Sequence, residues 1–254
     1  LIKLNDAPEG VVVASSPGFA SSSASGSTTT TGILPLNGGE QQLKLEPGVV
    51  LRDASGAAVT GSVTANVVYY DPSANNAASV FPGGLNATAN FGNNNQDKVS
   101  FEPIGLFNIK LSAGGKSVKT FSNGGLTLKT EIPTGAINPS NNQPYKANDK
   151  IGMWSREEGS GEWTFEKEAT VKNVNGKLIL EENVTHLSDH MFADYYDYCW
   201  ISVKVNLTGK VSVPTTDDYY HHWLWNEHVY FYLVDTNGRE QHVDHSYISF
   251  NQDG

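Results

Sequence analysis

The chain has 254 residues and a formal net charge of −10, and its 17 lysines and arginines form no cluster, which excludes the basic surface of a nucleic-acid-binding protein. Its single cysteine, Cys199, excludes an intrachain disulfide and a cysteine-ligated zinc site. Hydrophobic residues make up 38% of the chain, enough to bury a core, and charged residues only 17%. With abundant Gly, Ser, Thr and Asn, this composition favours short strands joined by turns.

In chain order, the first segment is a Ser/Thr/Gly-rich tract over residues 15–31, whose composition predicts a linker or mobile loop. Strand signals then recur, bounded by turn residues, and the clearest alternation predicts strands over 63–70, 101–111 and 126–132. No window holds the apolar stripe of a helix, so we expect an all-β fold built from β-sandwich modules. The side chains expected in its core are Phe107, Ile109, Leu126, Leu128, Trp154 and Trp163.

Three parts are expected along the chain. They are an N-terminal segment with the Ser/Thr-rich linker (1–32), a first β-sandwich (33–198) and a smaller second β unit (199–254). The chain begins without a signal peptide, which we interpret as a mature chain whose targeting segment has been removed. It ends on a turn with no strand after it, so we expect the natural protein to continue. No apolar run is long enough to span a membrane.

The second unit contains a hairpin signal, Asn237-Gly238, between strands expected over 227–234 and 240–250. A two-residue type I′ loop predicts the register of these strands. In that register His228 lies opposite Tyr247 and His245 lies opposite Tyr230. Because side chains alternate along a strand, His242 is expected on the other face of the ribbon.

Several motifs carry a resemblance to a known family. In chain order they are Leu45-Glu-Pro-Gly-Val-Val-Leu-Arg-Asp-Ala-Ser-Gly56, Phe81-Pro-Gly-Gly-Leu85, Phe101-Glu-Pro-Ile-Gly-Leu-Phe-Asn-Ile109, Asp149-Lys-Ile-Gly-Met-Trp154, Gly161-Glu-Trp163 and Val184-Thr-His-Leu-Ser188. Their order resembles bacterial surface proteins related to the ZU5 and GAIN-like β-sandwiches, with a pattern similar to the FAM171 and cartilage intermediate-layer proteins. The segment from Leu207-Thr-Gly-Lys-Val211 onward resembles the start of a carboxypeptidase-regulatory-like module. The resemblance implies a ZU5/GAIN-like first domain, a small transthyretin-like or Ig-like second unit, and a cell-surface location.

The resemblance makes His186-Leu187-Ser188 the sharpest candidate site, because GAIN domains and some ZU5 domains cut themselves at such a triplet. It implies that the Ser188 hydroxyl attacks the preceding carbonyl, with His186 as the base, and that water hydrolyses the resulting ester. In the structural alternative, Ser188 caps a bend and His186 packs against a tryptophan. The pair Phe192-Ala193 follows two residues later than in self-cleaving relatives, so we expect an intact chain.

Other polar clusters carry weaker hypotheses. Five acidic residues could form a calcium site, and the alternative is that they lie in solvated turns. Five of the seven histidines could form a zinc site, and the alternative is that they are scattered on the surface of strands. The acidic set is Glu181, Glu182, Asp189, Asp194 and Asp197, and the histidines are His221, His222, His228, His242 and His245. In both cases we favour ordinary surface residues and expect no metal and no cofactor.

The expected function is that of a non-catalytic structural or binding module in a larger exported protein, with a bacterial lipoprotein or an adhesion protein as the expected setting. An unknown protein or glycan at the cell surface is its expected partner, and a lipidated N-terminus outside this chain is one way of anchoring it. One alternative is a self-processing domain cut between Leu187 and Ser188. Another is a glycan-binding module that uses exposed aromatic side chains from Tyr195 to Trp225. The binding candidates in this stretch are Tyr219, Tyr220, Trp223 and Trp225.

Overall fold

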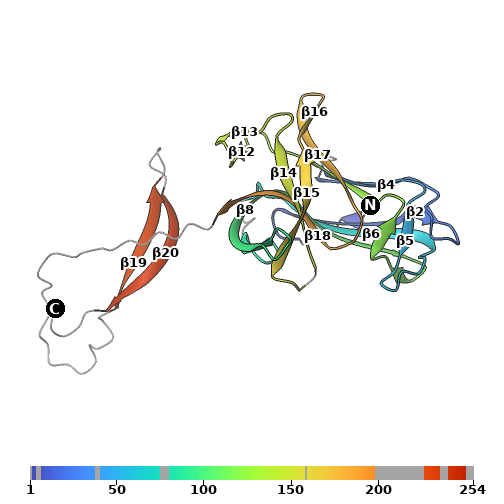
Figure 1. Cartoon of the computed structure of the whole chain (residues 1–254), viewed down its shortest axis with the longest axis horizontal. Coiled ribbons are helices and arrows are strands. Elements are labelled where there is room, and N and C mark those ends of the chain that lie inside the picture. The colour runs from blue at the N-terminus through green and yellow to red at the C-terminus, as the bar shows by residue number, and fades with distance from the viewer. Residues whose placement is uncertain are drawn as a thin grey trace, which may run out of the picture. The chain divides into compact units, whose positions relative to one another are not determined.

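The computed structural model of the chain (Figure 1) describes residues 2–3, 7–37, 41–74, 80–157, 159–197, 226–234 and 240–249. All the elements in these ranges are strands, and none is a helix, so the expected all-β class is confirmed. The chain divides into two compact units, residues 1–200 and 201–254.

The three strands predicted from the clearest alternation are present. They lie in β6 (Gly61–Tyr70), β8 (Gln96–Ala113) and β11 (Leu126–Glu131). All six side chains predicted for the core are at most 3% exposed. The period of two in the apolar residues therefore identified both the strands and their buried faces.

The larger sheet has nine strands, of which eight follow one another as hydrogen-bonded neighbours. Their order is β1 (Ile2–Lys3), β2 (Val11–Ser22), β6, β8, β18 (Asp189–Asp197), β14 (Lys150–Arg156), β15 (Glu162–Thr170) and β7 (Asn86–Asn90), and the ninth strand, β9 (Lys116–Ser117), pairs with β8. These pairs are antiparallel, except that β15 and β7 are parallel.

A second sheet has five strands, and three two-stranded pairs complete the described elements. The five-stranded order is β16 (Lys172–Val174), β17 (Lys177–Val184), β11, β4 (Gln41–Leu45) and β3 (Gly32–Leu36). The pairs are β5 (Val50–Arg52) with β10 (Thr120–Ser122), β12 (Ile137–Asn138) with β13 (Gln143–Pro144), and β19 (Asn226–Val234) with β20 (Glu240–Ser249).

The main core contains apolar side chains from both the nine-stranded and the five-stranded sheet. Every second residue of β6 from Val63 to Tyr69 is buried, as are Leu126 and Leu128 of β11 and Leu43 of β4. Removing this apolar surface from water is the main favourable contribution to folding. The sheet faces that meet in this core are those that the sequence predicted.

The far end of the larger sheet closes on itself. β7 pairs with β8 on one side and with β15 on the other, so β8, β18, β14, β15 and β7 form a closed strand ring. The register of β8 with β18 shifts between Phe192 and Ala193. Such a bulge bends a strand, and β8 is long and curved (Figure 1). A second apolar cluster fills this ring: Phe81, Ala87, Ala89, Val99, Phe101, Leu106, Trp154, Trp163, Met191 and Ala193.

The linker predicted over residues 15–31 is wrong for its first half, because residues 15–22 belong to β2 and pair with β6. Phe19 and Ala20 are 5% and 2% exposed, so the tract contributes to the core. Gly18, at a φ of 68°, lies where the register of β2 shifts. Pairing with β6 and the burial of Phe19 overrode a composition that is typical of linkers.

In the second unit, β19 and β20 have the predicted pairs His228 with Tyr247 and Tyr230 with His245. A register shift between Phe231 and Tyr232 then places His242 opposite Tyr232. By alternation, His242 takes a position on the same face of the ribbon as His245. The expectation that His242 lies on the other face is therefore wrong, because the two-residue loop assumed no bulge.

Candidate functional site

The bend predicted as a self-cleavage site joins β17 to β18 and is fixed by the segment around β10. The Leu187 amide donates to the Lys119 carbonyl oxygen at 2.8 Å, and the Phe121 amide donates to the Thr185 carbonyl oxygen at 2.8 Å. Leu187 and Ser188 are 7% and 9% exposed. The Leu187–Ser188 peptide bond is therefore held in a paired, nearly buried segment.

The histidine within hydrogen-bonding distance of Ser188 is His190, not His186. Ser188 Oγ lies 3.3 Å from His190 Nε2. The His186 Nε2 atom instead lies 3.7 Å from Glu166 Oε1, and its ring packs against the His190 ring at 5.2 Å. The expected packing of His186 on a tryptophan is replaced by this pair of imidazoles. The signal for His190 was its spacing, since Ser188 directly precedes β18 and side chains two residues apart in an extended chain point to the same side.

The hydrogen bonds of His190 favour one tautomer. Its Nε2 lies 3.0 Å from the His186 carbonyl oxygen, which can only accept, so Nε2 carries the proton. Nδ1 is buried and has no hydrogen-bond partner, and burial lowers the pKa of His190 to about 3. The Ser188 hydroxyl lies 3.2 Å from the Asp189 carbonyl oxygen, to which it donates. His190 is thus a neutral donor toward Ser188, the opposite of what a general base needs.

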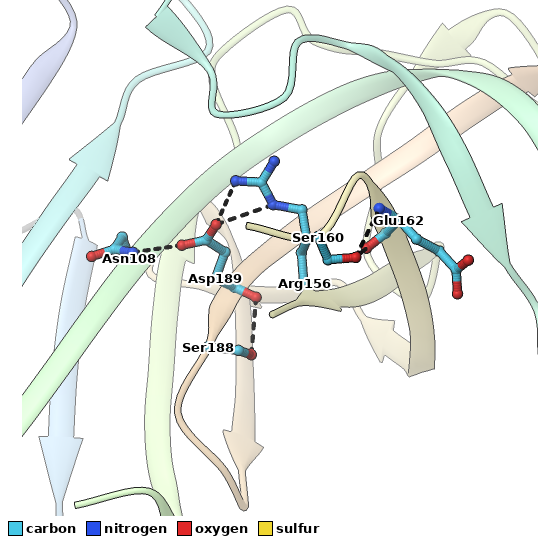
Figure 2. Close-up of polar contacts among 6 residues, drawn as sticks. All are labelled: Asn108, Arg156, Ser160, Glu162, Ser188 and Asp189. Carbon is cyan, nitrogen blue, oxygen red and sulfur yellow. Dashed lines mark hydrogen bonds and ion pairs between the residues drawn. The ribbon is translucent and has the colours of Figure 1, made fainter. Parts of the chain in front are cut away.

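Beside the bend, a buried ion pair closes one end of the strand ring, which we call the sealed end. Arg156 Nη2 and Nε lie 2.6 and 3.2 Å from Asp189 Oδ2, and Asn108 Nδ2 donates to Asp189 Oδ1 at 2.6 Å (Figure 2). The guanidinium also lies 5.1 Å from the centre of the Trp163 ring. Both ends of the ion pair are nearly inaccessible, since the Arg156 and Asp189 side chains are 8% and 4% exposed.

Gly83 completes the sealed end. Its φ of 84° suits glycine, and a Cβ there would come 2.2 Å from Arg156 Nη1. The loop lies directly over the guanidinium at a position without a side chain, and a larger residue there would displace the end of the Arg156 side chain. Sequence reasoning missed Arg156, Asn108 and Gly83, since the pairing of β14 with β18 joins residues 33 positions apart.

The opposite end of the strand ring, which we call the open end, is lined by aromatic rings. Phe91, Phe165 and Tyr195 lie with ring centres 5.4, 5.2 and 5.8 Å from Trp154, at angles of 80°, 68° and 88° to it. The Trp154 Nε1–H donates to the Ala193 carbonyl oxygen at 3.0 Å, and the indole is 1% exposed. Tyr195, by contrast, is 39% exposed.

A cavity of about 200 Å³ lies among these rings and also contacts Lys150, Glu168 and Asp194. Asp194 accepts a hydrogen bond from the Tyr145 hydroxyl at 2.7 Å. Burial raises the pKa of Asp194, as do the charges of nearby acidic residues, and the Tyr145 bond acts in the opposite direction. The open end therefore combines apolar ring surface with carboxylates and an amine, the composition of a ligand pocket.

Three of the five acidic residues weighed for calcium have separate partners. Asp189 pairs with Arg156, Asp194 with Tyr145, and Glu182 with Lys167 at 2.7 Å. In the part of the chain that the structure describes, no group of three or more His, Cys, Asp or Glu residues is arranged to hold a metal ion. The binding candidates Tyr219, Tyr220, Trp223 and Trp225 lie outside the described residues, as do His221 and His222.

Comparison with known proteins found no similarity: no protein-family model, curated protein or solved structure matches the chain. A search of the described residues found no helix that is long and apolar enough to cross a membrane.

Proposed function

We propose that this chain is a non-catalytic module of a larger exported protein, which binds a ligand at the open end and uses the His-Leu-Ser bend as a structural closure. The observation that carries the proposal is the hydrogen bond from His190 Nε2 to the His186 carbonyl oxygen. Because Nε2 bears a proton there, it has no lone pair to accept the proton of Ser188. A serine without a base is a weak nucleophile.

The family and the location are part of this proposal. The order of the sequence motifs supports a bacterial surface protein with a ZU5/GAIN-like first domain, followed by a transthyretin-like unit. The all-β fold with its two large sheets is consistent with that assignment. A protein or glycan partner at the cell surface and an anchor outside this chain complete the proposed setting.

Denaturing mass spectrometry of the purified full chain tests the non-catalytic part. We expect one species at the full mass of 27.4 kDa, stable on prolonged incubation at neutral pH. Two fragments, 1–187 and 188–254, would contradict the proposal and assign Ser188 as a nucleophile. Ser188→Ala should leave the mass spectrum unchanged apart from the loss of one oxygen.

Self-processing remains a second candidate, because one observation favours it: Ser188 Oγ lies 3.3 Å from an imidazole nitrogen. If the proton of His190 moved to Nδ1, Nε2 could accept from Ser188. In that case His190→Gln, and not His186→Gln, should abolish the cut. The two variants thus separate the base that the geometry supports from the base that the sequence motif implies.

A further inference from the structure

At the open end of the strand ring a small cavity lies next to the buried apolar cluster. Trp154 forms its base and is covered by Phe91, Phe165 and Tyr195, with Tyr195 partly open to solvent. The cavity of about 200 Å³ is small for a drug-sized ligand. Its volume suits one ring-sized group, inserted from solvent past Tyr195.

Gly152 allows this arrangement. A Cβ at residue 152 would lie 2.5 Å from Trp154 Nε1 and 3.0 Å from the Ala193 carbonyl oxygen. Only a glycine therefore lets the indole lie across β14 and donate to β18. The pocket base is built into the strands of the ring, which favours a preformed site.

Charged groups of both signs share the face that carries the rings. Lys150 pairs with Thr170, Gly152 with Glu168 and Trp154 with Phe165 in the β14–β15 ladder. Paired residues of antiparallel strands lie on one face, so Lys150 and Glu168 flank the aromatic rings. Lys150 Nζ lies 2.5 Å from Thr170 Oγ1, to which it donates. The pocket lining thus offers both a carboxylate acceptor and an ammonium donor.

This combination selects among ligand classes. A flat apolar ligand would remove the Glu168 carboxylate from water without supplying a hydrogen-bond donor, which is unfavourable. An organic cation would be attracted by the rings, Glu168 and Asp194 and repelled by Lys150, to which it could offer no hydrogen-bond acceptor. A sugar ring meets every requirement, because its apolar C–H face can pack on an aromatic ring while its hydroxyls both donate and accept.

We propose that the open end binds one pyranose unit of a neutral glycan, with Tyr195 as the stacking ring and Glu168 and Lys150 as hydrogen-bonding partners. The assignment rests on the proposed role as a binding module and names its ligand class. Of the aromatic stretch from Tyr195 to Trp225 that the sequence suggested for glycan binding, the proposal keeps Tyr195 and places the site in the described pocket lined by β14, β15 and β18.

The chain supplies a matched control for the stacking ring. Tyr195 and Tyr196 are adjacent and 39% and 49% exposed, but only Tyr195 lines the cavity. Neighbouring residues of a strand point to opposite faces, so the two variants differ in face rather than in chemistry. Tyr195→Phe keeps the ring and should retain binding, which separates loss of stacking from loss of fold.

The test is an NMR titration of the full chain with the methyl glycosides of glucose, galactose, mannose and N-acetylglucosamine, and with choline as a cation probe. At least one glycoside should shift amide signals of residues 150–154, 165–168 and 193–195. Tyr195→Ala should weaken its binding about tenfold, the loss of one aromatic contact, and Tyr196→Ala should leave the affinity unchanged. Glu168→Ala should weaken it several-fold, as loss of one hydrogen-bond partner does.

Binding by none of the four glycosides, or equal losses in Tyr195→Ala and Tyr196→Ala, would overturn the saccharide assignment. Choline binding that depends on Tyr195, without glycoside binding, would overturn it too, but would leave the broader role as a binding module standing. Self-cleavage at Ser188 would contradict the non-catalytic role whatever the sugars do. The two proposals therefore fail in different measurements.

Discussion

At the sealed end of the strand ring Arg156 is 8% exposed and pairs with Asp189, whereas at the open end Tyr195 is 39% exposed and borders a cavity. Both ends combine aromatic rings with charged side chains. At the sealed end the charges satisfy one another, and Trp163 lies against the guanidinium. At the open end Glu168 and Lys150 flank the rings without pairing with each other in the described contacts. We infer that one end stabilises the ring and the other is left for a ligand.

The largest expected effect breaks the sealed end. Arg156→Met leaves the Asp189 carboxylate buried with Asn108 as its remaining side-chain partner. Removing one member of a buried ion pair typically lowers the free energy of unfolding by about 3–5 kcal/mol. Urea unfolding followed by near-ultraviolet circular dichroism measures the change. The double variant Arg156→Met with Asp189→Leu should recover part of the loss, and a fully stable single variant would show that Asp189 is solvated.

The next effect concerns pH. The folded-state pKa of His190 is lowered to about 3 by burial, below the ordinary value of 6.5. The unfolded chain therefore binds a proton first, and the stability that neutral His190 contributes is present above pH 6.5 and lost as pH falls toward 3. Between pH 7 and pH 4 the wild type should lose up to about 3 kcal/mol more than His190→Gln.

The comparison with the variant is needed because other buried acids act in the opposite direction. Burial raises the pKa of Asp194 and of Glu102, so each contributes stability as pH falls. These contributions are common to the wild type and His190→Gln and cancel in their difference. Parallel stability curves for the two proteins would show that His190 is accessible to protons in the folded state.

A smaller effect is expected where the indole crosses β14 at the open end. Gly152→Ala places a methyl group against Trp154 and should lower the free energy of unfolding by about 1–3 kcal/mol through overpacking. Gly161→Ala is the matched control, because no heavy atom lies within 4 Å of a Cβ built there. Equal unfolding midpoints for the two alanine variants would mean that the indole can move aside.

The smallest effect separates binding from stability. Tyr195→Ala should lower the free energy of unfolding by only about 1 kcal/mol, because the ring is partly exposed and loses two aromatic contacts. The same urea experiment measures it. A loss as large as that of Arg156→Met would show that Tyr195 is part of the core, and that both ends of the ring are structural.

The comparison also explains how far the sequence could predict this molecule. Alternation identified β6 and β11, because a strand with one buried face has a local period, and the size of the indole rings predicted the burial of Trp154 and Trp163. The strand ring has no such signal, since the parallel pairing of Trp163 with Ala89 joins distant segments. The β2 strand was missed because serine and glycine composition outweighed the burial of Phe19.

The sequence located the bend but not the contacts around it. Sequence reasoning found the bend and named His186 and Ser188. It missed that His190 lies next to Ser188 and that Asp189 is buried against Arg156 and Asn108. Those contacts depend on the register of β18 with β14 and β8, which only the folded chain specifies. The open end was missed for the same reason, since Phe91, Phe165 and Tyr195 come from three separate segments.

The most direct test of the central claim, that the bend is closed to chemistry, is nitrogen-15 NMR of the histidine imidazoles. For His190 we expect a neutral ring at pH 7 and at pH 5, with the proton on Nε2 and a bare Nδ1. A ring protonated on Nδ1, with Nε2 free to accept from Ser188, would contradict the account, as would an imidazolium at pH 5.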